Sequence, residues 1–276
     1  AKFLEVEEGS VSSFGVGLNH LTFLTRLRYN GEDAIPMIHD KLRSQKATLQ
    51  DEIAGKSEWA NIVTGRPPRY SDDPFSWDMF EKYSIFPCAM DRHATEFYPE
   101  RFPGGSYCGR LLGREAFPID KRIGLGDQWY QEMLDIAHSP DPLPKSYYEN
   151  VPGESEQLLE IMHSLLRDEK KAFSVNMPNQ GQAPFLPRDA VIECNGAAVA
   201  GGFMPIMADE LPPALVAKLQ SKISAIEITV EAALRGDREL MLEALLADGG
   251  VGEVDKATAL RDALIEAHRP HLPQFA

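Results

Sequence analysis

The chain has 276 residues, of which 43% are hydrophobic and 25% charged, and its net charge is −14. A chain of this size can bury a sizeable core, and its negative charge opposes general attraction to nucleic acid or to anionic lipid. Its three cysteines are widely spaced and include no C-x-x-C pair, which argues against a disulfide framework or a structural zinc site. We find no basic-then-apolar leader and no apolar run long enough to cross a bilayer, so the sequence predicts a soluble, cytoplasmic protein without a nucleic-acid or membrane partner.

The first third of the chain predicts a strand or hairpin followed by a helix. β-Branched and aromatic residues fill positions 11–29, and this stretch ends at Asn30-Gly31, a turn signal. Apolar residues at helical spacing over 33–53 predict a helix, with Gly55 as its stop. Residues 64–76 have the composition of a loop, and a short helix is expected at 77–83.

Prolines divide the middle of the chain into short elements. Pro87, Pro99 and Pro103 forbid a long regular element there. Further helices are expected at 127–138 and 154–166, and short strands at 172–176 and 190–194.

The last third predicts three helices. The first begins after two prolines and stops at Gly236, and its apolar residues form one stripe. Shorter helices are expected at 238–246 and 256–268, each preceded by a capping aspartate, Asp237 or Asp255. Strands clustered with segregated helices indicate an α+β fold, which we expect to form a single domain over 1–276. The stripe consists of Leu215, Leu219, Ile223, Ile226, Val230 and Leu234.

Asn19 and His20 are an adjacent polar pair in the apolar stretch GLNHLTFL. Burying an amide and an imidazole costs free energy unless each finds a partner. A buried histidine most often donates to a backbone carbonyl, and one histidine does not complete a metal site. The residues alone therefore leave a structural role and a binding role open.

A second candidate is the charged run Asp91-Arg92-His93, followed by Glu96, in a segment bounded by prolines. Charged clusters usually form solvated loops or structural ion pairs, but this one is flanked by large apolar residues. Arg92 could grip a carboxylate with two hydrogen bonds, and Asp91 or His93 could transfer a proton. The turn-rich sequence NMPNQG at 176–181 is a third candidate, for which ordinary turn chemistry is the preferred explanation.

The chain has no dinucleotide-binding motif. GVGLNH has two glycines spaced as in Gly-x-Gly-x-x-Gly, but His20 stands where the third glycine belongs. A P-loop and an H-E-x-x-H motif are also absent from the sequence.

Taken in chain order, these stretches resemble glycoside hydrolase family 4, the NAD- and metal-dependent glycosidases, whose members include alpha-galactosidases and 6-phospho-beta-glucosidases. GLNHLTFLTRL is similar to the family's G-[IL]-N-H segment, and FPCAMDRHATEFYP to its active-site loop. ENVPGESEQLLEIMHSL resembles its S-G-E helix, and NMPNQGQAPFLPRDAVIE its N-x-P-N-x-G-x-I-x-x-L-P-x-D-x-V-V-E block. LPPALVAKL and IEAHRPHLP resemble its closing helices, so the resemblance spans nearly the whole chain.

The resemblance implies a fold like the C-terminal domain of lactate and malate dehydrogenases, a twisted antiparallel sheet packed with helices. It also implies a redox-elimination route in place of two-carboxylate hydrolysis. In that route NAD oxidises the sugar at C3, a base removes the C2 proton, the glycosidic oxygen leaves, water adds and the hydride returns. A divalent metal, typically manganese, holds the C2 and C3 oxygens as a Lewis acid. By this resemblance His20 is a metal ligand, while Asn19, Arg92 and His93 contact substrate.

The chain departs from the family pattern in two ways. It has no N-terminal Rossmann domain, and no cysteine precedes His20 to act as the second metal ligand. We therefore expect the substrate-side domain without its Rossmann partner, binding neither NAD nor Mn²⁺ completely and inactive in isolation. The family's catalytic tyrosine or aspartate position holds Met90 here, so Asp91 is the candidate base, one residue displaced, and Tyr83 is the weaker alternative.

The form of the charged loop resembles the subgroup that acts on alpha-galacturonides or related uronides, with Arg92 paired to the C6 carboxylate. A 6-phospho-glycosidase of the same family is the near alternative, with a phospho-sugar as substrate. A dehydrogenase-type C-terminal domain and a non-catalytic oligomerisation domain are the remaining alternatives. Family members associate through this half, so a homodimer or tetramer is expected.

Overall fold

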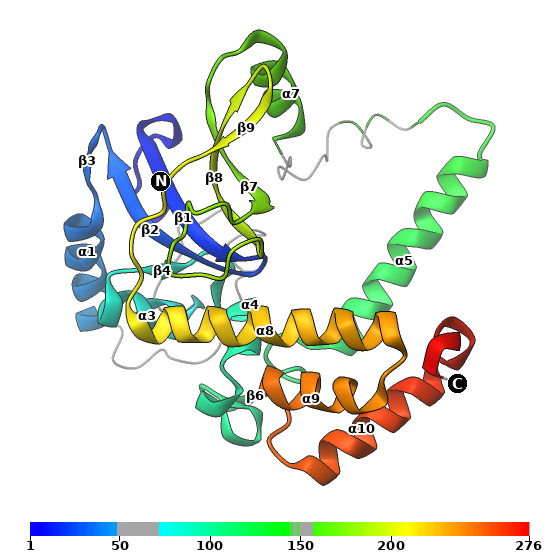
Figure 1. Cartoon of the computed structure of the whole chain (residues 1–276). Coiled ribbons are helices and arrows are strands. Elements are labelled where there is room, and N and C mark those ends of the chain that lie inside the picture. Colours follow the sequence, from blue (N-terminus) through cyan, green and yellow to red (C-terminus); the bar gives the residue numbers. More distant parts are fainter. Residues whose placement is uncertain (49–71, 144, 146–147, 149–156, 276) are drawn as a thin grey trace.

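The computed structural model describes residues 1–48, 72–143, 145, 148 and 157–275 (Figure 1). Within these residues the main sheet has seven antiparallel strands, which are β1 Val11–Leu18, β2 Leu21–Tyr29, β3 Glu32–Asp33, β4 Phe86–Pro87, β7 Ala172–Pro178, β8 Val191–Val199 and β9 Gly202–Pro205. Five of them follow the order β3-β2-β1-β8-β7, with β4 beside β2 and β9 beside β8. A separate small ribbon joins β5 Ser106–Tyr107 to β6 Arg110–Leu111.

Helices surround this sheet, which gives the α+β fold expected from the sequence. The α-helices are α1 Ile35–Thr48, α3 Pro74–Tyr83, α4 Met90–Ala94, α5 Ile119–His138, α7 Leu158–Arg167, α8 Pro213–Arg235, α9 Arg238–Asp248 and α10 Val254–Ala267. Short 3₁₀ turns are η1 Glu8–Ser10, η3 Thr95–Phe97, η4 Pro99–Arg101, η5 Pro103–Gly105, η6 Arg269–His271 and η7 Pro273–Phe275. None of the helices in the described ranges combines the length and hydropathy needed to traverse a bilayer.

The sequence left a strand or a hairpin open over 11–29, and the structure shows a hairpin. β1 and β2 pair along their whole length, and the last pair before the turn is Leu18 opposite Leu21. Asn19 and His20 are the two residues left to form the turn. A glycine is required beside it at Gly17, because a Cβ atom there would lie 2.2 Å from the Leu21 carbonyl oxygen.

The main hydrophobic core lies between one face of the sheet and α8. Val16, Phe23 and Ile192 are fully buried and belong to one cluster with Leu215 and Leu219 of α8. Burial of apolar surface, at about 25 cal/mol per Å², is the main favourable contribution to such a fold. Figure 1 shows α8 crossing below the strands, with α9 and α10 on its far side.

The apolar stripe predicted for the long helix is buried over its first half alone. Leu215, Leu219 and Ile223 pack on the sheet, whereas Val230 is 49% and Leu234 is 81% exposed. The prediction of one buried stripe along the whole helix was therefore wrong. The helix continues past the end of the strands that cover it (Figure 1).

The two predicted aspartate caps have different outcomes. Asp237 caps α9 as predicted, because its Oδ1 accepts hydrogen bonds from the backbone nitrogens of Glu239 and Leu240, at 2.9 and 3.1 Å. The second prediction was wrong, since α10 begins at Val254 and Asp255 lies inside its first turn.

Several predicted element boundaries shift. The helix expected at 127–138 begins at Ile119, and the one expected at 77–83 begins at Pro74. The strand expected at 190–194 continues to Val199. The end of the predicted 33–53 helix, most of the 64–76 loop and residues 154–156 lie outside the described residues.

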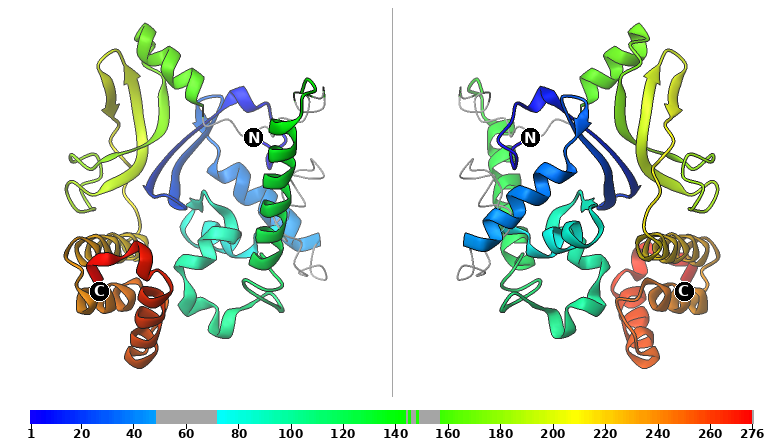
Figure 2. Two further views of the ribbon diagram at one scale, coloured as in Figure 1. Left: turned by 90° about the vertical axis from the view of Figure 1, so that its right-hand side faces the viewer. Right: turned by 90° about the vertical axis from the view of Figure 1, so that its left-hand side faces the viewer.

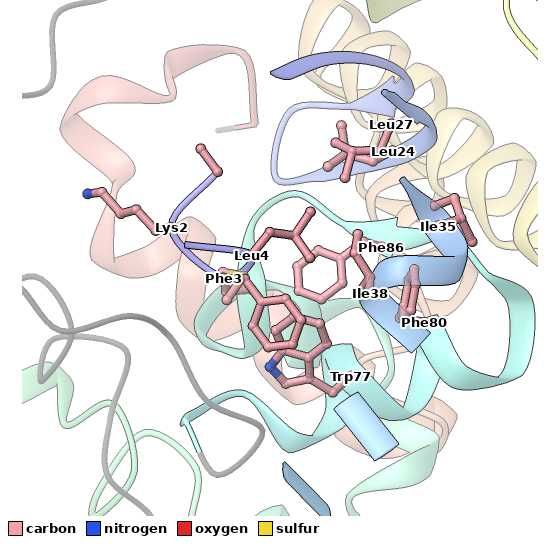
Figure 3. Close-up of a pocket in the computed structure, with 12 residues that line it drawn as sticks. Lys2, Phe3, Leu4, Leu24, Leu27, Ile35, Ile38, Trp77, Phe80 and Phe86 are labelled. Atoms are coloured by element: carbon pink, nitrogen blue, oxygen red, sulfur yellow. The ribbon is translucent and has the colours of Figure 1, made fainter. Parts of the chain in front are cut away.

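A second, smaller core lies between α1 and α3. It contains Phe3, Ile38, Leu42, Trp77 and Phe80. The rings of this cluster also line an apolar pocket of about 350 Å³ (Figure 3). This core fixes α3, which in turn positions the charged segment that follows it.

Candidate functional site

Asn19 and His20 are exposed in the turn of the β1–β2 hairpin. Their neighbours Leu18 and Leu21 are buried, so residues on both sides attach the turn to the core. The polar pair is therefore presented to solvent and not buried with its neighbours. His20 has a left-handed backbone with φ of 63°, an uncommon conformation for a residue other than glycine, and such residues often occur at functional sites.

The ring of His93 stacks on the ring of His20. Their centroids are 4.0 Å apart and their planes are inclined by 28°. His93 lies in the short helix α4, so this contact joins the hairpin turn to the charged segment. Two of the candidate residues, far apart in the sequence, are thus in direct contact.

The surroundings of His93 favour its neutral form. Partial burial, and next the neighbouring His20, lower the pKa of His93 below that of a free histidine. Glu96 acts in the opposite direction, with its Oε2 atom 3.5 Å from His93 Nδ1, but the net shift is downward. A neutral imidazole can donate one hydrogen bond and accept another, as the recognition of sugar hydroxyls requires.

The carboxylate of Asp91 is fully buried. It accepts hydrogen bonds from the backbone nitrogens of Phe75 and Ser76, at 2.8 and 2.6 Å, and from the Tyr107 hydroxyl at 2.5 Å. Burial raises the pKa of Asp91, while these hydrogen bonds counter that effect. Asp91 thus joins α4 to the first turn of α3 and to β5. A base must reach the proton that it removes, so this burial argues against the base role predicted for Asp91.

Tyr83, the alternative base, lies at the C-terminal end of α3 and is half-buried. Its ring packs against the main core, and the Lys82 ammonium lies 4.9 Å from the ring centroid. The proposed role of Tyr83 as a base therefore stays a prediction.

Arg92 lines a hollow next to the histidine pair. The hollow has a volume of about 510 Å³, and its walls come from residues between Arg92 and Ile119 together with Gly250. Arg92 and His93 are neighbours on α4, yet the first lines this hollow and the second stacks on His20. Arg92 and His93 therefore point to different sides of α4 and do not line the same cavity.

One polar cluster near the hairpin turn was not singled out from the sequence. Glu193 of β8 accepts hydrogen bonds from Thr22 Oγ1 at 2.8 Å and from Ser174 Oγ at 3.0 Å. Its carboxylate thus connects β2, β8 and β7 close to the turn that carries His20. The only sequence signal was that Glu193 is an acidic residue inside a predicted apolar strand. Its position near the turn depends on how β8 pairs with β1 and β7, which are distant from each other in the sequence.

Turn chemistry accounts for the NMPNQG sequence, as preferred in the sequence analysis. Asn179 is fully buried, and its Nδ2 group, which has two N–H donors, lies within hydrogen-bond distance of three backbone carbonyl oxygens, those of Ala183, Leu186 and Pro187. Its Oδ1 atom accepts from the backbone nitrogens of Gly181 and Ala183. Asn179 therefore holds the loop between β7 and β8.

A complete metal site is not found in the part of the chain that the structure describes. No three side chains among its histidines, cysteines, aspartates and glutamates gather closely enough to hold an ion. His20 alone could supply part of a coordination shell, because a divalent ion requires several ligands. The described residues thus do not fit a resident metal by themselves.

The fold, His20 in the hairpin turn and the charged segment agree with the family to which the sequence is similar. The chain belongs to glycoside hydrolase family 4, since the model for the "Family 4 glycosyl hydrolase C-terminal domain" matches residues 15–251. Its relatives include an alpha-galacturonidase of Lachnoclostridium phytofermentans, 27% identical over 273 residues, which cover 94% of this chain and 54% of the relative. An alpha-galacturonidase of Bacillus subtilis is 28% identical over 246 residues, covering 88% of this chain and 51% of the relative.

Solved structures of family 4 enzymes share the fold. A 6-phospho-alpha-glucosidase from gut microorganisms, in complex with NAD and glucose-6-phosphate, matches with a TM-score of 0.68 and 20% identity over 99% of this chain and 59% of its own. A 6-phospho-beta glucosidase from Thermotoga maritima, with manganese, NAD⁺ and glucose-6-phosphate, gives a TM-score of 0.65 and 18% identity over 95% of this chain and 55% of its own. The chain thus spans about half the length of the proteins it matches.

Proposed function

We propose that this chain is the sugar-binding half of an NAD- and manganese-dependent glycosidase that acts on alpha-galacturonides. The observation that carries the proposal is the stacked pair of His20 and His93, which unites the two segments most similar to the family's site. The alpha-galacturonidases among the relatives support the choice of substrate.

The cofactors of the whole enzyme would be NAD and Mn²⁺, as in the family 4 structures that contain them. The resemblance implies that NAD supplies the reversible oxidation of the sugar, and manganese the stabilisation of negative charge on its oxygens. The described residues offer neither a dinucleotide-binding motif nor a full set of metal ligands. We therefore assign no redox step to this chain and expect it to be inactive alone.

His20 would contribute one ligand to the metal. It is exposed on a tight turn, and the contact with His93 orients its ring. A pre-oriented ligand loses little side-chain freedom on binding, which favours a site completed by groups from elsewhere. Asn19, in the same turn, and His93 would form hydrogen bonds with sugar hydroxyls.

Arg92 would recognise the C6 carboxylate of a uronide. A guanidinium forms two parallel hydrogen bonds with a carboxylate, and in a chain of net charge −14 an acidic sugar needs such a local positive group. The second candidate substrate is a 6-phospho-glycoside, because the same guanidinium could bind a phosphate. A probable 6-phospho-beta-glucosidase of Bacillus subtilis, 23% identical over 278 residues, favours keeping it.

Asp91 would anchor the charged segment, and Tyr83 would be the alternative base. The three hydrogen bonds to the Asp91 carboxylate support the anchoring role, since each would be lost if the carboxylate turned toward a substrate. We also propose that the protein acts in the cytoplasm and associates as a dimer or tetramer.

The test is a comparison of substrates with the whole enzyme that contains this chain, supplied with NAD and Mn²⁺. Hydrolysis of an alpha-galacturonide at least about tenfold faster than that of the matching 6-phospho-glucoside would support the proposal. Faster hydrolysis of the phosphorylated sugar would favour the second candidate. Hydrolysis of neither would overturn both.

A further inference from the structure

The hollow beside α4 adjoins the proposed sugar site but is not part of it. The stacked pair of His20 and His93 does not line the hollow, whereas Arg92, next to His93 on α4, does. Its volume of about 510 Å³ lies within the range of about 300–1,000 Å³ that is usual for sites binding a drug-sized ligand. The hollow therefore offers space for a part of the substrate beyond the sugar that is cleaved off, which is the leaving group.

The walls of the hollow are mostly apolar, as is typical of small-molecule sites. The rings of Phe102 and Phe117 line it, and its far wall is closed at Gly250, in the loop between α9 and α10. Figure 1 and Figure 2 show the segment that contains β5 and β6 beside these two helices. Among the lining residues in the described part of the chain, Arg92 and Glu96 carry a charge, and Glu96 Oε2 lies 3.5 Å from His93 Nδ1.

Arg110 lies at the edge of the hollow, on the face of the β5–β6 ribbon that is turned toward it. It stands opposite Tyr107 in the ribbon, and side chains directly opposite each other lie on the same face. The Tyr107 ring packs against Phe102 and Phe117, which both line the hollow, with centroids 5.8 Å apart in each pair. Leu112, two residues after Arg110, also lines the hollow, and alternate residues of an extended segment share a face.

The guanidinium of Arg110 has no partner among the residues that the structure describes. The side chain is half-buried, yet it forms no hydrogen bond, ion pair or ring contact with any of them. Taking a charge out of water costs free energy, so a half-buried arginine usually has an anionic partner. Arg26 pairs with Asp209 and Arg261 with Glu239. Arg110 therefore has an open place for an anion, although the chain as a whole carries a net charge of −14.

We propose that Arg110 is a specificity-determining residue, which binds the carboxylate of the leaving sugar when the substrate is a uronide of two or more units. A guanidinium matches a carboxylate with two parallel hydrogen bonds. Arg92 binds the carboxylate of the cleaved sugar, and Arg110 binds that of the next sugar, whose ring lies in the hollow against Phe102 and Phe117. The inference rests on the proposed function and extends it from the cleaved sugar to the leaving group.

The test compares two substrates of the whole enzyme that contains this chain, supplied with NAD and Mn²⁺. Alpha-linked digalacturonate has a carboxylate on its leaving sugar, whereas methyl alpha-galacturonide has none on its leaving group. In Arg110→Ala we expect the KM for digalacturonate to rise about tenfold or more, and the KM for the methyl glycoside to change by less than about twofold. Arg110→Lys should recover part of the loss, because lysine keeps the charge but not the two-pronged geometry. The melting temperature should change little, since no described partner of Arg110 is lost.

Arg167→Ala is the matched control, since this arginine of α7 is also without a partner among the described residues, and it should leave both KM values unchanged. In Arg110→Ala, equal losses for the two substrates would overturn the inference, because a structural role affects both alike. An unchanged KM for digalacturonate would overturn it as well. In either case the unsubstituted enzyme still hydrolyses the methyl glycoside, so the proposed function stands. Hydrolysis of neither substrate by the unsubstituted enzyme would overturn the proposed function, and this inference with it.

Discussion

The imidazole rings of His20 and His93 stack with their centroids 4.0 Å apart, although one belongs to a hairpin turn and the other to a short helix. His20 is exposed, so its ring adds little to the buried core. The contact instead fixes the direction of an imidazole that would otherwise rotate in solvent. A fixed imidazole beside a neutral one suits a site that binds a metal and a sugar together.

His20→Ala should remove metal-dependent turnover and leave the fold intact. We expect manganese affinity to fall about a hundredfold or more, because a ligand is lost, and the melting temperature to change little, because the side chain is exposed. Calorimetric titration of Mn²⁺ into the whole enzyme measures the first effect. His163→Ala, an exposed histidine on α7, is the control and should retain full affinity. Equal affinity in both variants would remove His20 from the metal site.

Arg92→Ala should weaken uronides far more than neutral glycosides. The lost pair of charge-assisted hydrogen bonds should raise the KM for a galacturonide about tenfold to a hundredfold, with a small effect on a galactoside. Arg92→Lys should recover part of the loss, since lysine keeps the charge but not the two-pronged geometry. Arg101→Ala, which removes an exposed arginine of the same segment, serves as control. Similar losses for both classes of sugar would count against carboxylate recognition.

Asp91→Asn should lower the free energy of unfolding by about 2–4 kcal/mol, because an amide cannot accept all three hydrogen bonds that the carboxylate receives. Tyr107→Phe removes one of these donors and should lower it by about 1 kcal/mol. Urea denaturation measures both. If Asp91 is an anchor, the folded Asp91→Asn enzyme keeps measurable turnover below its melting temperature. Loss of all turnover in a variant of unchanged stability would restore Asp91 as the base.

The ion pair of Arg26 with Asp209 should make stability depend on pH. Burial raises the pKa of Asp209, but the hydrogen bonds from Arg26 and Thr25 outweigh burial and lower the pKa below its usual value. A carboxyl group with a lowered folded-state pKa stabilises the fold above its unfolded-state pKa, and this contribution is lost as the pH falls through the folded-state value. Asp209→Asn should therefore reduce stability by about 1 kcal/mol at most near neutral pH, and by almost nothing in acid. A loss that is the same at both pH values would contradict the assignment.

The sequence predicted those elements whose signals are local. The extended stretch 11–29 followed from its β-branched residues and from the turn at Asn30-Gly31, which joins β2 to β3, whereas the hairpin turn itself, at Asn19-His20, was not predicted. Asp237 was recognised as a cap, because capping depends on the residues next to it in the sequence. Features that depend on distant segments were missed. Val230 and Leu234 in the second half of α8 are exposed because the helix continues past the strands that pack on its first half, and those strands come from distant parts of the sequence.

The candidate site shows the same division. Proximity of Asn19 and His20 to the charged segment was inferred from a family resemblance, and the structure brings His20 and His93 into contact. The burial of Asp91 was not visible in the sequence, since its partners Phe75 and Tyr107 lie in separate elements. Glu193 was missed for the same reason, because its contact with Thr22 depends on strand register.

The most direct test of a shared site is the imidazole NMR spectrum of the whole enzyme during addition of sub-stoichiometric Mn²⁺. A paramagnetic ion broadens the signals of nuclei close to it, so the signals of His20 and His93 should broaden together and before those of His163 on α7 and His268 after α10. Addition of galacturonate should strengthen that selective effect. Broadening that reaches all the histidines equally, or that spares His20 while affecting another, would contradict the account.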